Sequence, residues 1–151
     1  MLNNYLTSDT ITFAENVDGW RDAITRVTAP LLSSGSITPA YVDAVTNSIA
    51  AGGVYIDLGF GIALAHSRPE NGVLRTALSS LRVTPAVLLN DDPAHPIDLF
   101  FCLAATDQHS HLKTMMELAK LLSNDELRTR LLAATTPAET STVIEENGTT
   151  E

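Results

Sequence analysis

The chain has 151 residues, of which 44% are hydrophobic, and this suits a single domain whose core needs no disulfide or metal. Its net charge of −9 argues against nucleic-acid binding, because neutralising phosphates requires a basic face. The apolar runs are too short to span a bilayer and Cys102 is the single cysteine, so we expect no transmembrane helix, no internal disulfide and a cytoplasmic location.

The first third of the chain predicts one short strand and two helices. The β-branched residues within 10–13 favour a strand. Apolar residues recur at helical spacing over 19–35, although Pro30 predicts a kink or an early end. The segment 38–53 has a clearer helical pattern, because Thr38 is a candidate N-cap, a proline occupies the favoured first position and two glycines end it. Its expected buried stripe is Tyr41, Val45 and Ile49, with Val42.

The middle third predicts strands. Residues 54–67 are typical of short strands interrupted by glycines, and the segments 76–83 and 86–89 are two further candidates. The run 97–105 is almost continuously apolar, as expected of a strand that is covered on both faces. Cys102 lies inside this run, so we expect it to be a small core residue rather than a nucleophile.

The last third predicts three helices, over 109–124, 125–134 and 136–146. The first of them should bury an amphipathic stripe made of Leu112, Met115, Met116, Ala119 and Leu122. Helices and strands alternate along the chain, which predicts an α/β fold with a mixed sheet. We expect one domain over residues 1–145, followed by a polar, disordered tail over 146–151.

His66 is the first candidate for chemistry, because it stands where an apolar strand ends and a loop begins. The backbone N–H groups from Ser67 onward are not expected to belong to a strand ladder, and together with Arg68 they form a plausible anion site. An imidazole is a competent nucleophile near neutral pH. The alternative interpretation is an ordinary loop histidine.

His111 and His109 lie at the start of the predicted helix 109–124, where the N-terminal field favours anions. The alternative is a capping or surface role. Their i, i+2 spacing points them to different sides of a helix, so they are a poor metal pair. His95 lies between two prolines and is expected to be an exposed loop residue. The sequence contains no metal or nucleotide-binding motif, so we expect no metal and no cofactor.

Three motifs occur in order: the Tyr-Val pair of a helix at 41–42, the segment GIALAH at 61–66, and DQHSHL at 107–112. With these motifs, residues of about 5 to 145 resemble the enzyme IIA domains of the bacterial phosphoenolpyruvate-dependent sugar phosphotransferase system, of the mannitol–fructose type. The stretch HSRPENGV at 66–73 most resembles the L-ascorbate-specific branch.

The resemblance implies a mixed sheet of about five strands sandwiched by helices. It implies that His66 accepts a phosphoryl group from the phosphohistidine carrier protein and passes it to a cysteine of the cognate enzyme IIB. It also implies that His111 lies across the pocket and stabilises the phosphoryl group. Contact with the membrane would be indirect, through the transporter, and a homodimer is a further possible assembly.

Two positions depart from the family pattern. Members commonly have proline directly before the phosphorylated histidine, whereas this chain has Ala65. Some relatives carry an arginine on the preceding helix, but here no Lys or Arg occurs between Tyr41 and Ser67. Arg68 is the candidate for that positive charge, with Arg75 as the second choice.

Two other functions remain open from the sequence. A domain of this type can act as a phosphorylation-sensing regulator through protein contacts, although this chain shows no DNA-binding segment. It could also be an α/β domain that binds a small molecule near Gly59 and Gly61.

Overall fold

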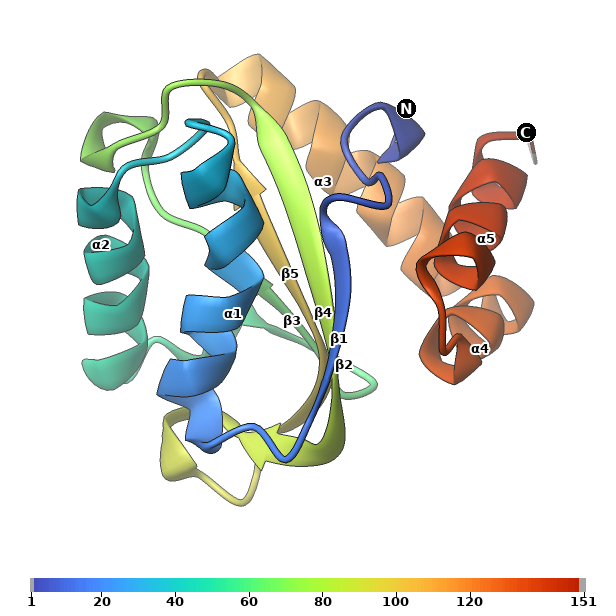
Figure 1. Cartoon of the computed structure of the whole chain (residues 1–151), viewed down its shortest axis with the longest axis horizontal. Helices are drawn as coiled ribbons and strands as arrows, with labels where there is room; N and C mark the ends of the chain where they lie inside the picture. The colour runs from blue at the N-terminus through green and yellow to red at the C-terminus, as the bar shows by residue number, and fades with distance from the viewer. Residues whose placement is uncertain (1, 150–151) are drawn as a thin grey trace.

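The computed structural model describes residues 2–149 and contains one five-stranded mixed sheet (Figure 1). The strands are β1 (Ile11–Glu15), β2 (Asp57–Gly59), β3 (Ile62–Ala65), β4 (Ala77–Leu88) and β5 (Pro96–Ala104), in the spatial order β1-β4-β5-β3-β2. The pairs β1–β4 and β3–β5 are parallel, whereas β4–β5 and β2–β3 are antiparallel. The predicted α/β class and the mixed sheet of about five strands are confirmed.

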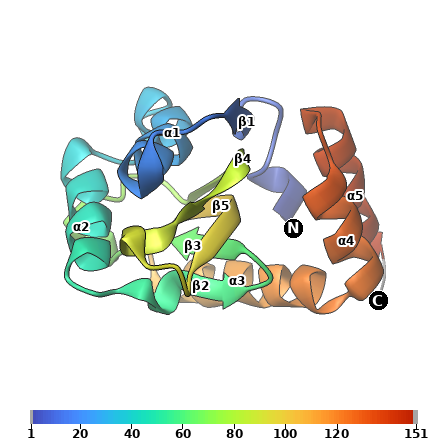
Figure 2. The same ribbon diagram turned by 90° about the horizontal axis from the view of Figure 1, so that it is seen from below.

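Helices cover both faces of this sheet (Figure 2). One face carries α1 (Gly19–Ser33) and α2 (Pro39–Ala50), and the other carries α3 (Gln108–Ser123), α4 (Asp125–Ala133) and α5 (Pro137–Thr149). Four short 3-10 turns complete the fold: η1 (Leu2–Asn4), η2 (Val54–Ile56), η3 (Pro69–Asn71) and η4 (Leu89–Asp91). No helix among residues 2–149 is long and apolar enough to cross a membrane.

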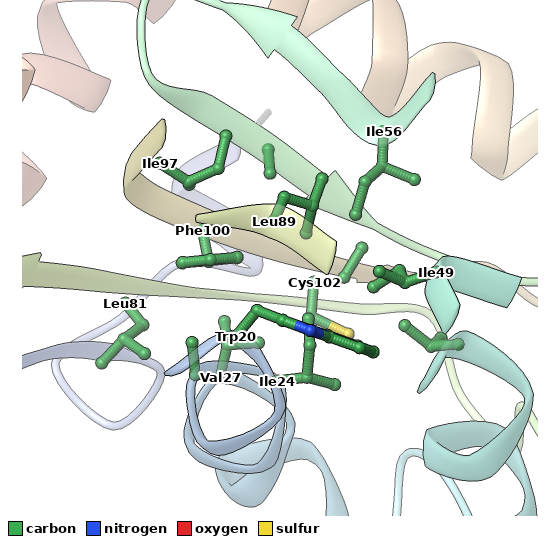
Figure 3. Packing of buried hydrophobic residues seen from close by; sticks show 14 of the residues in the cluster. Trp20, Ile24, Val27, Ile49, Ile56, Leu81, Leu89, Ile97, Phe100 and Cys102 are labelled. Carbon is green, nitrogen blue, oxygen red and sulfur yellow. The ribbon is translucent and has the colours of Figure 1, made fainter. Parts of the chain in front are cut away.

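The two layers of core follow from the alternation of side chains along the strands. On β5, Phe100 and Cys102 pack toward α1 and α2, and Phe101 and Leu103 pack toward the other helices. Figure 3 shows Trp20, Phe100 and Cys102 in the first of these layers. Burial raises the pKa of the Cys102 thiol to about 12, so it stays protonated as a small core residue.

Helix α2 buries the predicted stripe: Tyr41, Val45 and Ile49 are buried and Val42 packs partly against them. Helix α1 runs through Pro30 to Ser33 rather than ending early. Leu31, just after the proline, is buried in the core, and the Ser34 amide still donates to the Pro30 carbonyl at 3.0 Å. Only the final turn of α1 follows the proline, so the burial of Leu31 outweighs the loss of the one backbone hydrogen bond that a proline cannot donate.

The two strands predicted over 76–83 and 86–89 are a single strand, β4. Its pairing with β5 is irregular between Arg82 and Val87 and resumes at Val87, which lies opposite Ile97. Pro85 therefore falls in a stretch where the ladder to β5 does not need its missing amide donor. Sequence pattern alone separated the two halves because a proline normally ends a strand.

The stripe predicted for the helix over 109–124 is confirmed for Leu122 and in part for Met115, and is wrong for its other three residues. In α3 the buried residues are Thr114, Leu118, Leu121 and Leu122, while Leu112 and Met116 are 55% and 70% exposed. Apolar residues occur on more than one side of this helix, so helical spacing fits two different faces. The face that packs against the sheet is buried, and the face that carries Leu112 and Met116 stays exposed.

The end of the chain also differs from the predicted tail. Helix α5 continues to Thr149, so residues 146–149 are helical, while 150 and 151 lie outside the described residues. Asn147 is buried, its carbonyl accepts from the Lys120 ammonium at 3.0 Å, and its amide donates to the Glu117 carbonyl at 3.4 Å. Packing against α3 thus orders a segment whose composition alone is typical of disorder.

Candidate functional site

His66 is the first residue after β3, and the four residues of that strand are fully buried. Its ring is half-buried, and Nδ1 lies 2.9 Å from the Leu64 carbonyl oxygen. Because a carbonyl can only accept, Nδ1 must carry the proton and Nε2 the lone pair. The backbone therefore selects the tautomer in which Nε2 is the nucleophilic nitrogen.

The His66 ring lies in an open cleft of about 690 Å³. Four segments meet there: the end of α2, the turn η2, the loop that begins at His66, and the start of α3. All four residues predicted for the site line this cleft: His66, Ser67, Arg68 and His111. The sequence placed them in two segments more than forty positions apart, and the fold brings them together.

His111 faces His66, with 5.5 Å between ring centroids and 49° between ring planes. It lies in the first turn of α3, whose N-cap residue Asp107 accepts the Ser110 amide at 2.7 Å. Burial, and to a lesser degree the repulsion that a protonated His111 would meet from a protonated His66, lower the pKa of His111. His111 is therefore a neutral imidazole near pH 7, with one N–H to donate to an anion.

The other two histidines lie outside the cleft. His109 is exposed on α3 and does not line it. The prediction that His95 is an exposed loop residue is wrong, because its Nδ1 pairs with Asp57 Oδ2 at 2.8 Å and the side chain is only 26% exposed. The partner, Asp57, is the first residue of β2 and lies 38 positions away in the sequence, so no local pattern could reveal the pair.

The backbone just beyond His66 is held by a buried tyrosine. The Ser67 amide donates to the Tyr41 hydroxyl oxygen at 2.8 Å, and that hydroxyl donates to the Leu103 carbonyl at 2.8 Å. The Ser67 carbonyl is a second acceptor for the same hydroxyl at 3.2 Å. The expectation that the Ser67 amide is available to an anion is therefore wrong, although its hydroxyl, which accepts from the Asn71 amide at 2.8 Å, faces the cleft.

The two arginine candidates differ in position. Arg68 is exposed and lines the cleft, so it can reach an anion held there. Arg75 donates instead to the Ser34 carbonyl at the end of α1 and does not line the cleft. Of the two, Arg68 is the cation that the site can use.

Two hydroxyl residues of the cleft, Ser48 and Tyr55, were not among the predicted site residues. Ser48 Oγ and Tyr55 Oη lie 3.2 Å apart, and the Tyr55 ring meets His66 edge-on at 6.2 Å between centroids. Ser48 follows Tyr41 by two helical turns, so the same face of α2 carries both, and that spacing was an available signal. Tyr55 lies in η2 and shows no comparable pattern.

The assembled cleft offers hydroxyl, amide, imidazole and guanidinium donors around one nucleophilic nitrogen. This donor set suits a transferred oxyanion such as a phosphoryl group. Among residues 2–149, no three His, Cys, Asp or Glu side chains are grouped so that they could hold a metal ion.

Comparison with known proteins identifies relatives over nearly the whole chain. Residues 4–147 match the family model "Phosphoenolpyruvate-dependent sugar phosphotransferase system, EIIA 2". A mannitol-specific cryptic phosphotransferase enzyme IIA component of Escherichia coli K12 is 30% identical over 145 residues, covering 95% of this chain and 97% of that protein. The ascorbate-specific EIIA component of the same strain is 28% identical over 127 residues, covering 83% and 82%.

Solved structures agree with this comparison. The solution structure of the mannitol-specific cryptic enzyme IIA from Escherichia coli superimposes with a TM-score of 0.88 at 29% identity, covering 96% of this chain and 98% of that one. A complex of enzyme IIAMTL with phosphorylated enzyme IIBMTL, also from Escherichia coli, has a TM-score of 0.76 at 20% identity, with 93% and 97% covered. The second likeness concerns the fold alone.

Proposed function

Because this chain belongs to the EIIA type 2 family of the phosphoenolpyruvate-dependent sugar phosphotransferase system, we propose that it carries a phosphoryl group on Nε2 of His66. The observation that carries the proposal is the hydrogen bond from His66 Nδ1 to the Leu64 carbonyl, which leaves Nε2 as the lone-pair nitrogen of a ring that lies 5.5 Å, centroid to centroid, from the His111 ring.

The proposed donor is the phosphohistidine carrier protein. The Nε2 lone pair forms a new P–N bond while the P–N bond to the carrier breaks, and that electron pair returns to the carrier imidazole. The proton stays on Nδ1, where its hydrogen bond to the Leu64 carbonyl holds the ring in place. Both steps of the relay need in-line approach and charge stabilisation more than new covalent chemistry.

The proposed acceptor is a cysteine thiolate of an enzyme IIB. The sulfur attacks phosphorus, the P–N bond to His66 breaks, and the imidazole recovers its lone pair. Support for this partner comes from the similar fold that is found in complex with phosphorylated enzyme IIBMTL. During transfer, the neutral His111 donates a hydrogen bond to a phosphoryl oxygen, and the Arg68 guanidinium and the Ser67 hydroxyl add further donors.

We propose that this relay operates in the cytoplasm and serves uptake of L-ascorbate or a related compound, on the resemblance of residues 66–73 to that branch. The protein itself does not contact the sugar in this scheme, so its assignment to one transport system depends on which enzyme IIB accepts its phosphoryl group. Comparing transfer from the phosphorylated protein to ascorbate-type and mannitol-type enzymes IIB tests this assignment. Equal or faster transfer to the mannitol type would contradict it.

The central experiment incubates the protein with phosphoenolpyruvate, enzyme I and the carrier protein and locates the acid-labile phosphate by mass spectrometry. We expect one phosphate on His66 and none after His66→Ala, because Nε2 is the acceptor. His109→Ala is the matched control, since that histidine is exposed and outside the cleft, and it should be labelled fully. Stoichiometric labelling of the His66→Ala protein would refute the proposal.

A further inference from the structure

The parallel ladder between β3 and β5 has a regular hydrogen-bond alternation that stops just beyond His66. Leu99 of β5 donates its amide to the Gly61 carbonyl, and in a parallel pair every second residue of a strand is bonded in this way. Every second residue from Gly61 is bonded to β5, so the first bonded position beyond the end of β3 is Ser67. Its amide would then donate directly to the carbonyl of Leu103.

The structure has a tyrosine hydroxyl between those two groups. The Ser67 amide donates to the Tyr41 oxygen at 2.8 Å, and the Tyr41 hydroxyl donates to the Leu103 carbonyl at 2.8 Å. One side-chain oxygen therefore replaces one hydrogen bond of the ladder. It satisfies both backbone groups while it holds the two strands apart at that position.

We propose that Tyr41 is a positioning residue for phosphoryl transfer, and that its hydroxyl fixes the point at which the chain leaves the sheet after His66. This inference rests on the proposed function of His66. It gives the histidine two fixed neighbours: the Leu64 carbonyl bonds its ring, and Tyr41 bonds the next residue along the backbone.

The surroundings of Tyr41 suit this role. Its side chain is 0% exposed, so water does not compete for the two hydrogen bonds. Burial raises the pKa of the phenol well above its ordinary value, which keeps the hydroxyl hydrogen available for donation. The ring is anchored by α2, where Val45 and Ile49 bury the same face of the helix.

Removing the hydroxyl should let the ladder close by one hydrogen bond. The Ser67 amide and the Leu103 carbonyl would pair directly, because each is otherwise left without a partner in the interior. That closure draws the residue after His66 toward β5 and turns Nε2 away from His111. A displacement of about 1 Å at a reacting group costs on the order of a hundredfold in rate.

The test is Tyr41→Phe, which keeps the ring and removes the oxygen. We expect its rate of phosphorylation by the carrier protein to fall by tenfold to a hundredfold, about the range that a small displacement produces. Tyr5→Phe is the matched control, because Tyr5 packs against the other core layer and should transfer at the wild-type rate. Wild-type transfer by Tyr41→Phe would overturn the inference.

A second variant separates positioning from stability. Val45→Ala creates a cavity on the same face of α2 without touching Ser67, so it should lower the free energy of unfolding but leave the transfer rate close to that of the wild type. If Val45→Ala slows transfer as much as Tyr41→Phe does at a similar loss of stability, the role of Tyr41 is only structural.

A third measurement does not depend on phosphorylation. In ¹⁵N NMR spectra of the unphosphorylated protein, Tyr41→Phe should shift the Ser67 amide and the ring nitrogens of His66, and Val45→Ala should leave them near their wild-type positions. Unchanged signals in Tyr41→Phe would overturn the inference even if His66 is phosphorylated. Changed signals in a protein that is never phosphorylated would instead uphold the geometry and refute the proposed function.

Discussion

At the scale of single residues, two neighbouring imidazoles have different tasks because their surroundings differ. His66 has one nitrogen tied to a backbone carbonyl, so its tautomer is set by the fold. His111 is kept neutral by burial and by its neighbour, so it donates a hydrogen bond without competing as a cation. The two identical side chains therefore suit the different roles proposed for them, one as an acceptor of phosphorus and the other as a donor to its oxygens.

The lowered pKa of His111 predicts how stability depends on pH. The folded state resists protonating this ring, whereas the unfolded chain binds the proton near the ordinary value of 6.5. The free energy of unfolding should therefore be unaffected above that pH and should fall as the pH drops from 6.5 through the folded-state pKa. Urea unfolding of the wild type and His111→Gln between pH 8 and about 5 measures this difference.

The comparison isolates one ring, since the other three histidines are present in both proteins. The wild type should lose more stability than His111→Gln on acidification. Parallel pH profiles for the two proteins would show that His111 titrates as it does in the unfolded chain.

At the scale of elements, α3 has two functions on two faces. Its inner face packs on the sheet, and its outer face carries Leu112 and Met116, one turn apart and directly after His111. We call these two side chains the α3 ridge. Any protein whose nucleophile reaches His66 Nε2 must cover the rim of the cleft, and the α3 ridge, which begins one residue after His111, is an exposed apolar surface close to that rim.

Met116→Lys therefore should raise the KM for the phosphorylated carrier protein or for enzyme IIB by on the order of tenfold, with little change in kcat. Steady-state transfer kinetics measure this split. Leu32→Lys is the control, because Leu32 is an exposed apolar residue on α1, which covers the opposite face of the sheet from α3. An equal KM for Met116→Lys and the wild type would show that partners dock elsewhere.

At the scale of the whole molecule, the sheet order explains the site. The parallel strands β3 and β5 are neighbours, and their carboxyl ends lie at one edge of the sheet. His66 follows β3 directly, and His111 lies in the helix that follows β5, so both reach the same edge. Sites at the carboxyl ends of adjacent strands are a general feature of α/β folds.

The domain boundary is the prediction that belongs to this scale. A chain that ends at residue 145 should be less stable than one that ends at 149, by about 1–3 kcal/mol, because the buried Asn147 and its part-buried hydrogen bonds to α3 are lost. Urea unfolding of the two truncated chains measures it. Equal midpoints and slopes would mean that residues 146–149 contribute nothing to the fold.

The sequence by itself determined most of the elements and the candidate residues. Local signals reach a few positions along the chain, so they were enough for the stripe of α2, the buried run of β5 and the end of a strand at His66. They also nominated His66 and His111 as candidates, both of which line the cleft, whereas the roles proposed for them came from the family resemblance.

Tertiary structure alone decided everything that depends on distant neighbours. Strand β4 lies between β3 and β5 in the chain, so no local pattern could reveal that β3 and β5 pair. This pairing brings the ring centroids of His66 and His111 to 5.5 Å from each other. The same holds for the outer face of α3, for the partner of His95 and for Tyr41 beside Ser67. Each contact joins residues that are remote in sequence, and it contributes to stability only once the sheet has formed.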